Sequence, residues 1–345
     1  MALFDLPDFD DHEQVIYCSD DASGLKAIIA IHSTKLGAAV GGCRMWDYVS
    51  DEDALVDVLR LSKGMTYKNA MAGLSMGGGK SVIIGNASKI KSDALFKAFG
   101  EALNRLNGRY LSAEDVNITT HDIAITNSVT PYVTGTESKS GNPAPFTALG
   151  TFLGIKASVK HKFNRDDLTG LKVAVQGLGS VGYQLCEHLY QAGVELIVTD
   201  INQASVESAV AKFNAIAVGL DEIYDQDVDI YAPCALGATI NDETLSRLKA
   251  SIIAGCANNQ LAQPRHDHAL VERGILYAPD YVINAGGIIN ISFEENYHRE
   301  KSIAKVGEIY HTLLDIYAKA DAQNKPTGVI ADEMAREIIN KGSKT

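Results

Sequence analysis

Lys80 is the first residue of this sequence whose setting could do chemistry. It follows three glycines in GLSMGGGKS, residues 73–81. The phosphate-binding pattern of ATP-using enzymes requires a glycine, four residues and then Gly-Lys-Ser/Thr. Leu74 occupies the position of that first glycine, and Gly73 comes one residue too early. Helix-like residues also precede the loop and strand-like residues follow it, which is the reverse of a phosphate loop. A kinase or ATP-using ligase built on this loop is therefore excluded.

Lys80 could act as a base if its surroundings disfavour the ammonium form. A free lysine has a pKa of about 10.4. Burial and a second nearby ammonium can bring such a pKa towards ~7–8, where an amine accepts protons at neutral pH. Lys63 or Lys68 could supply that second charge, or hold a substrate carboxylate, and Asp115 could shuttle protons. Lys63 is explained better as a solvated helix lysine, whereas residue type alone leaves Lys68 and Asp115 undecided.

A second motif lies in the later half of the chain, in LKVAVQGLGSVG. A buried-type strand leads into Gly177-x-Gly179-x-x-Gly182, a helix-like run follows, and a second strand-like run ends at Asp200. This context is typical of dinucleotide binding, since the glycines admit a pyrophosphate at the amino end of a helix. Asp200 can bind a ribose hydroxyl and repel a 2′-phosphate, which favours NAD over NADP.

The elements that must position Lys80 alternate between helix and strand. Residues 50–70 carry apolar side chains near helical spacing. Residues 81–85, SVIIG, are typical of a short strand, as are residues 26–32 and 109–114. Lys80 is therefore predicted to lie in a helix-to-strand connection.

The later half of the chain alternates between strand-like and helix-like runs, as expected of a mostly parallel sheet with connecting helices. Its strand-like runs are residues 171–176, 195–199, 227–235, 251–255 and 274–287. Asn258, Asn259 and Asn284 near the ends of these runs suit a ligand crevice at strand carboxyl ends, although ordinary turn chemistry also explains each one alone. Residues 301–323 and 328–342 are predicted to be amphipathic helices.

Composition narrows the class of protein. The chain has 345 residues, a net charge of −12 and a pI near 5.2, which disfavours nucleic acid as a partner. It lacks a signal peptide's layout and an apolar run long enough to span a membrane. Five widely spaced cysteines suit reduced thiols, so we expect a soluble, cytoplasmic protein. His266 and His268 are expected in a solvated turn, and no metal site is predicted.

The expected fold class is α/β with two domains and a cleft between them. Residues 134–145, rich in Gly, Ser, Thr and Pro, are typical of an interdomain connection. We predict one domain at residues 1–135, together with the C-terminal helix at about 326–345, and a family resemblance carried by motifs along the chain implies that it binds substrate and forms the oligomer. Residues 136–325 are predicted to form a Rossmann-type, doubly wound NAD-binding domain.

Motifs along nearly the whole chain resemble the glutamate/leucine/phenylalanine/valine dehydrogenase family, and most closely its leucine dehydrogenase branch. They include GGCRMW, LRLSKGMTYKNA, GGGKSVIIG, NGRYLSAEDV, VQGLGSVG, DIYAPCALGA, AGCANNQL and APDYVINAGG. The resemblance implies NAD-dependent oxidative deamination of an L-amino acid to a 2-oxo acid and ammonia. It also implies a homo-oligomer, octamer or dimer, whose partners are these small molecules.

The resemblance also assigns roles to individual residues. It implies that Lys80 activates the attacking water, that Asp115 handles protons and that Lys68 binds the substrate carboxylate. Further substrate contacts are implied at Gly41, Val40, Met65, Ala113, Thr134, Asn259, Ile288 and Ile291. Cofactor contacts are implied or predicted at Thr147, Gly177, Leu178, Gly179, Ser180, Val181, Gly182, Asp200, Ala235, Asn258 and Asn284.

The residues implied around the substrate side chain are aliphatic and offer no cation, so a glutamate side chain is excluded because its buried charge would be unpaired. Leucine, valine and isoleucine fit such a pocket. Cys43 stands where leucine dehydrogenases usually have threonine, and GGGK and EDVNIT resemble the tryptophan and phenylalanine branches. An aromatic substrate therefore stays open, as does a non-catalytic NAD-binding sensor, against which the paired Lys68 and Lys80 argue.

Overall fold

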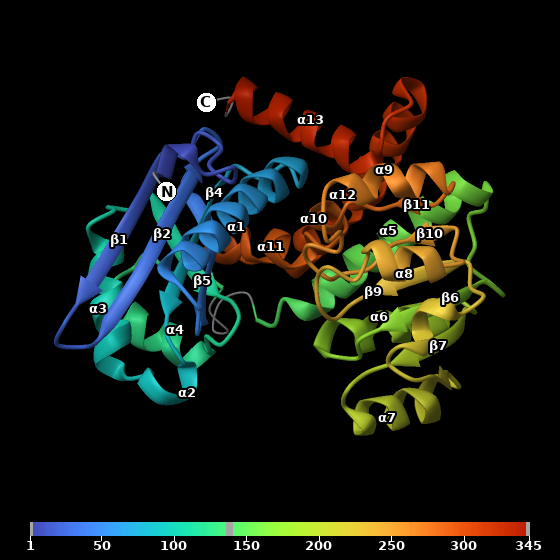
Figure 1. The fold of residues 1–345 in the computed structure, drawn as a ribbon, viewed down its shortest axis with the longest axis horizontal. Coiled ribbons are helices and arrows are strands. Elements are labelled where there is room, and N and C mark those ends of the chain that lie inside the picture. Colours follow the sequence, from blue (N-terminus) through green and yellow to red (C-terminus); the bar gives the residue numbers. More distant parts are fainter. Residues whose placement is uncertain (1–2, 136–140, 343–345) are drawn as a thin grey trace. The chain divides into compact units, whose positions relative to one another are not determined.

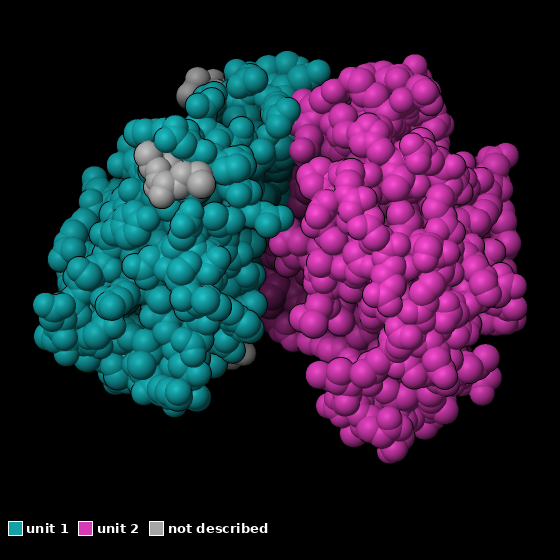
Figure 2. Space-filling model, in the orientation of Figure 1, with its two compact units in different colours: residues 1–141, 291–297, 335–345 teal, residues 142–290, 298–334 magenta. Residues whose placement is uncertain are grey.

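The computed structural model describes residues 3–135 and 141–342, and the chain divides into two compact units (Figure 2). Unit 1 contains residues 1–141, 291–297 and 335–345, and unit 2 contains residues 142–290 and 298–334. Part of the linker expected at residues 134–145 lies outside the described residues. The chain passes between the units more than once, because residues 291–297 return to unit 1.

Unit 1 is built on a mixed five-stranded sheet in the order β1-β2-β4-β3-β5; β1, β2, β4 and β5 are labelled in Figure 1. β2 is antiparallel to both β1 and β4, whereas β3 is parallel to both β4 and β5. The strands are β1 (Gln14–Asp20), β2 (Leu25–Ser33), β3 (Ala39–Trp46), β4 (Gly77–Ile84) and β5 (Tyr110–Glu114).

Helix α1 (Asp51–Met71) covers one face of this sheet. It begins where expected, because the Ser50 side chain accepts a hydrogen bond from the Asp53 N–H. Its buried side packs with alternate residues of β2 and β4 into one core; the layer includes Ile28, Ala30, Leu55, Val58, Leu59 and Val82. The intervening strand residues point to the opposite face.

That opposite face holds a second core. Ile29, Ile31 and Ile83 of the sheet pack there against the helices that follow β4. The other helices of unit 1, in which η marks a 3-10 helix, are η1 (Leu3–Asp5), α2 (Ala87–Ile90), α3 (Asp93–Asn104), α4 (Thr120–Asn127) and η3 (Glu294–Asn296). The sheet therefore lies between two helical layers, with one core on each of its faces.

Unit 2 contains a six-stranded, fully parallel sheet in the order β11-β10-β9-β6-β7-β8. The strands are β6 (Lys172–Gln176), β7 (Glu195–Thr199), β8 (Ile216–Ala217), β9 (Ile230–Pro233), β10 (Ile252–Ile253) and β11 (Leu276–Tyr277). The order reverses beside β6, the first strand of the sheet in the chain, as in doubly wound dinucleotide-binding folds. The expected fold class is confirmed.

The helices of unit 2 connect and flank these strands. They are α5 (Ala144–Phe163), α6 (Ser180–Gln191), α7 (Gln203–Phe213), η2 (Glu222–Asp225), α8 (Asp242–Arg247), α9 (Arg265–Glu272), α10 (Asp280–Ile283), α11 (Gly286–Ile291), α12 (Arg299–Gln323) and α13 (Thr327–Lys341). The last residue of α11 and the part of α13 from residue 335 belong to unit 1. None of the helices, over the described residues, is long and apolar enough to cross a membrane.

The structure corrects two predictions. The strand expected over residues 274–287 is only β11, followed by α10 and α11, because an apolar run alone does not separate a strand from a buried helix. His266 and His268 lie within α9 rather than in a solvated turn, and His266 is 2% exposed. The His266 Nδ1 accepts a hydrogen bond from the Gln263 N–H, which ties this histidine to the start of the helix.

Asp267 of α9 faces the beginning of α13. Its carboxylate accepts a hydrogen bond from the Val329 N–H at 3.3 Å, and a Cβ added to Gly328 would lie 2.6 Å from its Oδ2. Burial is the largest cause that raises the pKa of Asp267, to about 6, against the lowering effect of the backbone donors. The folded protein therefore favours the protonated form more than the unfolded chain does.

We predict that Asp267→Asn raises the free energy of unfolding at pH 8 by up to about 3 kcal/mol. A raised carboxyl pKa contributes stability that is present below about pH 4 and is lost as the pH rises through about 6. The advantage of the variant should therefore shrink towards pH 4, as followed by Tm against pH. Asp166→Asn, at an exposed carboxylate, is the control. An equal Tm difference at both pH values would contradict the prediction.

Candidate active site

Lys80 lies within strand β4, not in a loop. The predicted order of helix and then strand is confirmed, but the strand begins at Gly77, earlier than SVIIG suggested. A Cβ added to Gly78 would lie 2.0 Å from the Thr66 backbone nitrogen, so the Gly78 face of β4 is the face against α1. Side chains two residues apart share a face of a strand. Lys80 therefore points to the α1 side, where it is 6% exposed.

The glycines before Lys80 serve the packing of the protein itself. A Cβ at Gly77 would lie 2.1 Å from the Ser33 carbonyl oxygen, and one at Gly79 would lie 2.7 Å from the Tyr110 ring. Together with the contact at Gly78, these distances show that helix, strand and ring approach the β4 backbone too closely for any side chain. The glycines thus let α1 and β4 meet, and this close packing buries Lys80.

The charged partner of Lys80 is Asp115, directly after β5. The Lys80 Nζ lies 2.7 Å from the Asp115 Oδ2, and the two side chains are 7% and 22% exposed. Burial would raise the pKa of Asp115, but the Lys80 and Arg44 cations outweigh it and lower this pKa below its ordinary value. The two residues predicted to be catalytic are therefore brought together, as a carboxylate and a lysine in direct contact.

Arg44 of β3 is the second cation on this carboxylate, and sequence reasoning missed it. Its Nε lies 3.2 Å from the Asp115 Oδ2, and its guanidinium also reaches the Asp57 Oδ2 at 3.0 Å. The Tyr48 hydroxyl donates to the same Asp57 oxygen at 2.5 Å. The sequence did carry a signal for Arg44, because an arginine inside a strand of small and apolar residues requires an anionic partner.

The lysines of α1 occupy different environments. Lys68 lies half-buried in the last turn of the helix. Lys63 pairs with Asp10 at 3.0 Å, so it is a partly buried member of an ion pair and not a solvated lysine. The partner that the structure shows for Lys80 is thus a carboxylate, in place of the second ammonium that sequence reasoning suggested.

Gly41 and Met65 also lie together in unit 1. A Cβ at Gly41 would lie 1.8 Å from the Gly79 carbonyl oxygen and 3.3 Å from the Met65 Cγ. The Tyr110 hydroxyl donates to the Gly41 carbonyl at 2.7 Å and lies 3.0 Å from the Ser81 hydroxyl. Tyr110 therefore binds the Gly41 backbone from the face of the sheet opposite α1.

Cys43 belongs to the second core, on the face of the sheet opposite α1. It is 1% exposed and packs with residues of the second core, and burial raises the pKa of its thiol to about 12. It lies opposite Ser81 in the ladder between β3 and β4. Its side chain is therefore a core group of the sheet.

Several of the predicted substrate-pocket residues gather beside β5. The Ile291 Cδ1 and the Ala113 Cβ would lie 3.4 Å and 3.6 Å from a Cβ at Gly135. Thr134 donates from its hydroxyl to the Glu294 Oε2 at 2.7 Å. Val40 lies opposite Leu111 in the same sheet. Asn259 and Ile288 belong to unit 2, so their place beside the substrate stays a prediction.

The glycine turn of unit 2 has the geometry of a dinucleotide cradle. Gly177 adopts a φ of +104°, which side chains disfavour, and a Cβ there would lie 2.7 Å from the Ala235 Cβ. A Cβ at Gly182 would lie 2.0 Å from the Gly177 carbonyl oxygen. α6 begins at Ser180, so its first N–H groups face the turn. The turn, with Leu178 and Val181 between these positions, is thus held in a shape that only glycines allow.

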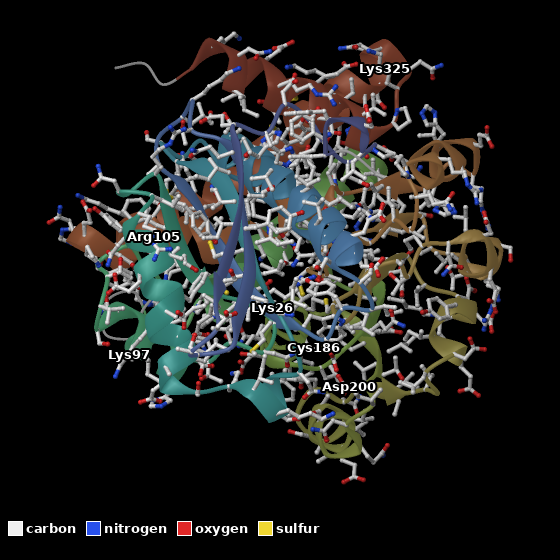
Figure 3. All side chains as sticks on the ribbon, turned by 60° about the vertical axis from the view of Figure 1, so that its left-hand side comes forward. Lys26, Lys97, Arg105, Cys186, Asp200 and Lys325 are labelled. Atoms are coloured by element: carbon white, nitrogen blue, oxygen red, sulfur yellow. The ribbon has the colours of Figure 1, made fainter. Side chains whose placement is uncertain are left out.

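Asp200, labelled in Figure 3, directly follows strand β7, beside this turn. Its carboxylate accepts hydrogen bonds from the Leu178 N–H, at 2.5 Å, and from the Asn202 N–H, at 2.7 Å. These bonds fix the carboxylate at the edge of a cavity of about 740 Å³. The cavity is lined by Gln176, Gly177, Gly179, Thr199, Asp200, Ile201, Leu220, Asp221, Tyr224, Cys234, Ala235, Leu236, Gly237, Ala238, Thr239 and Asn241.

This cavity suits a dinucleotide, because the predicted cofactor residues Gly177, Gly179, Asp200 and Ala235 are among its lining residues. Thr147, Asn258 and Asn284 are not among them. A Cβ at Gly179 would meet nothing within 4 Å, so the backbone there is open to a ligand. Asn284 donates to the Asn258 Oδ1 at 2.7 Å and to the Cys256 carbonyl at 3.1 Å. Its own Oδ1 is buried and, within the described residues, lacks a hydrogen-bond donor. Thr147 lies near the beginning of α5, where a Cβ on Gly287 would meet its hydroxyl at 2.9 Å.

The described residues contain no group of three or more His, Cys, Asp or Glu side chains that could hold a metal ion. Over residues 3–135 and 141–342, all five cysteines are free thiols. Unit 1 therefore offers an amine and a carboxylate in contact, and unit 2 by itself offers a glycine turn suited to a dinucleotide.

Comparisons with known proteins place this geometry among amino acid dehydrogenases. Residues 12–139 match the Glu/Leu/Phe/Val dehydrogenase dimerisation domain, and residues 196–327 match the Glutamate/Leucine/Phenylalanine/Valine dehydrogenase family. Leucine dehydrogenase from Geobacillus stearothermophilus is 54% identical over 98% of this chain and 94% of that protein. Leucine dehydrogenase from Thermoactinomyces intermedius is 52% identical over 100% and 95% of the two chains. The crystal structure of L-tryptophan dehydrogenase from Nostoc punctiforme matches with a TM-score of 0.85 and 48% identity, covering 96% of each chain.

Proposed function

The chain belongs to the glutamate/leucine/phenylalanine/valine dehydrogenase family, and from this membership we propose that it oxidatively deaminates branched-chain L-amino acids with NAD. Leucine is the proposed principal substrate, and valine and isoleucine are accepted as well. The products are the 2-oxo acid and ammonia, and the reaction is reversible. The observation that carries the proposal is the buried Lys80 amine, 2.7 Å from the Asp115 carboxylate.

The proposed reaction assigns one task to each polar residue of unit 1. Lys68 binds the carboxylate of the amino acid, as a half-buried cation can. Asp115 takes a proton from the substrate's amino group. Lys80 holds and activates the water that attacks the imine carbon, and then carries the proton that this water loses. A non-catalytic sensor would have no use for a buried amine and carboxylate in contact.

Unit 2 provides the cofactor site of the proposal. The glycine turn would hold the pyrophosphate, Asp200 the ribose hydroxyls, and Asn258, Asn284, Thr147 and Ala235 the nicotinamide side of the cofactor. A nicotinamide cofactor, when bound, accepts the hydride from the substrate's α-carbon. NAD is proposed over NADP because Asp200 is a carboxylate fixed at the cavity edge, where a 2′-phosphate would be repelled.

The side-chain pocket supports an aliphatic substrate. Ala113, Ile291, Val40 and Met65 are apolar, and Thr134 already donates its hydroxyl to Glu294. The Glu294 carboxylate would repel the side chain of glutamate and offers it no counter-charge. Size selection among leucine, valine and isoleucine is expected to be modest, since one methylene is worth ~1–3 kcal/mol.

An aromatic amino acid is the second candidate substrate. The observation that favours it is the 48% identity to L-tryptophan dehydrogenase, against 54% to a leucine dehydrogenase. We place it second, because the leucine dehydrogenases are more identical to this chain, at 54% and 52%.

The test is a panel of single L-amino acids at alkaline pH, followed by absorbance of the reduced cofactor. We predict that kcat/KM for leucine exceeds that for tryptophan, phenylalanine and glutamate by at least about tenfold. A higher value for tryptophan would replace the branched-chain proposal by the aromatic one. The absence of reduced cofactor with every amino acid would overturn the proposed function.

Assembly and location complete the proposal. We propose a homo-oligomer, dimer or octamer, formed through unit 1, since residues 12–139 match a dimerisation domain. A cytoplasmic location is proposed because free cysteines suit a reducing compartment. Light scattering coupled to size-exclusion chromatography would decide between the two assemblies.

A further inference from the structure

Arg44 joins the catalytic pair to a second carboxylate behind it. Its Nε contacts the Asp115 Oδ2 at 3.2 Å and its guanidinium contacts the Asp57 Oδ2 at 3.0 Å. The Arg44 side chain is 23% exposed, so its charge is partly desolvated and acts strongly on its neighbours. Asp57 comes from α1 and Arg44 from β3, so the contact also links helix to sheet.

Lys80 and Arg44 share a single oxygen of Asp115. In the proposed reaction Lys80 must turn from this carboxylate towards water and substrate. Arg44 does not take part in that exchange, so it can hold the carboxylate in place while the Lys80 amine moves. The Arg44 charge also disfavours protonation of Asp115, since it lowers the pKa of that carboxyl.

Titratable groups from several packed elements lie around the Asp115 carboxylate. Lys80 comes from β4, Arg44 and the buried Cys43 thiol from β3, Tyr110 from β5 and Asp57 from α1. Tyr48 binds Asp57, and burial is the largest cause that raises the pKa of its phenol above the ordinary value. The pKa values of Cys43 and Tyr110 are raised by burial as well, which keeps both neutral near pH 7. Lys80 and Arg44 are thus the cations in direct contact with Asp115, and Asp57 is linked to it through Arg44.

We propose that Arg44 is a positioning residue for the Lys80–Asp115 pair and that Asp57 sets how strongly Arg44 acts on it. The proposal rests on the proposed function, because it assigns a role in the same deamination. It makes a prediction that a merely structural role does not make. Removing the Arg44 cation and removing the Asp57 anion must move the protonation of the pair in opposite directions.

The first measurement is the pH dependence of kcat/KM for leucine, whose rise with pH reports proton loss from the free enzyme. Arg44→Gln removes a cation, so the pair holds its proton more tightly, and we expect the apparent pKa of this rise to increase by about one unit. Asp57→Asn leaves Arg44 less neutralised, so we expect a decrease of about half a unit. Arg44→Lys keeps the charge and should restore the wild-type value.

The second measurement does not depend on activity or cofactor. The Lys80 amine is labelled with a small acylating reagent over a range of pH, and the labelled peptide is quantified by mass spectrometry. The midpoint of the labelling rate should move up in Arg44→Gln and down in Asp57→Asn. This readout holds even where a variant turns over too slowly for a pH profile.

The control variant is Arg109→Gln, which removes an arginine of the same unit whose partner is Glu13. It should leave both pH midpoints unchanged. Shifts of the same sign in Arg44→Gln and Asp57→Asn, or no shift in the labelling of Lys80, would overturn the proposal while leaving the dehydrogenase assignment intact. If the wild type fails to oxidise any L-amino acid, the proposed function fails and the positioning role fails with it, whatever the labelling shows.

Discussion

Lys80→Ala is expected to lower kcat for leucine deamination by about 10²–10⁴-fold, with little change in cofactor affinity. The variant removes the amine that we propose activates water, whereas the cavity proposed for the dinucleotide is lined by residues of unit 2 alone. Arg44 still contacts the Asp115 carboxylate in the variant, so that charge keeps a partner and the sheet should fold. Initial rates of absorbance at saturating leucine measure kcat, and fluorescence titration with the reduced cofactor measures its Kd.

Lys63→Ala is the matched control for this prediction. It removes another lysine of unit 1, one that pairs with Asp10 and not with Asp115. Its kcat should stay within about twofold of the wild type, as expected for a partly exposed ion pair. A Lys80→Ala enzyme that retains nearly full activity, with a Tm like that of the wild type, would remove this residue from the chemistry.

Asp200→Asn is expected to raise kcat/KM with NADP, relative to NAD, by about 10- to 100-fold. The carboxylate lies at the edge of the dinucleotide cavity, where a 2′-phosphate would meet its charge. Removing one such repulsion is worth ~1–3 kcal/mol, and 1.4 kcal/mol corresponds to a factor of ten. The asparagine oxygen can still accept one of the two backbone N–H groups that Asp200 now holds. Parallel kinetics with NAD and NADP measure the ratio.

Asp221→Asn tests whether the effect belongs to Asp200 or to the general charge of the cavity. Asp221 lines the same cavity, but its charge is already paired with Arg247 at 2.8 Å. Its substitution should change the cofactor ratio far less. A wild-type enzyme that prefers NADP would show that Asp200 does not select the cofactor.

Local patterns carried much of the fold prediction. The strand, the three glycines and the acidic residue at the end of the next strand form one continuous segment, and the structure places β6, α6 and β7 there. Short-range geometry explains this success, since the glycine turn must connect neighbouring parallel strands through a helix. Local patterns did not explain the glycines before Lys80. These glycines leave room for α1, β2 and the Tyr110 ring, which are distant in the chain.

The ion pairs around Lys80 could not be predicted from the sequence. Asp115 lies 35 residues from Lys80 and 71 from Arg44 in the chain, and no local pattern links them. Parallel pairing of β3 with both β4 and β5 sets Cys43 opposite Ser81 and Glu114, so the residues next to these positions, Arg44, Lys80 and Asp115, come close together. Only that pairing makes the Arg44, Lys80 and Asp115 side chains neighbours.

The sequence by itself determined the residue types of the chemistry and the family: a lysine that can serve as a base, a carboxylate, and a glycine turn followed by an acidic residue. Only the tertiary structure shows that Lys80 contacts a carboxylate and not a second ammonium. It also shows that Arg44 contacts both Asp115 and Asp57. The physical reason is that charges interact through space, over a few ångströms, whereas motifs record only neighbours along the chain.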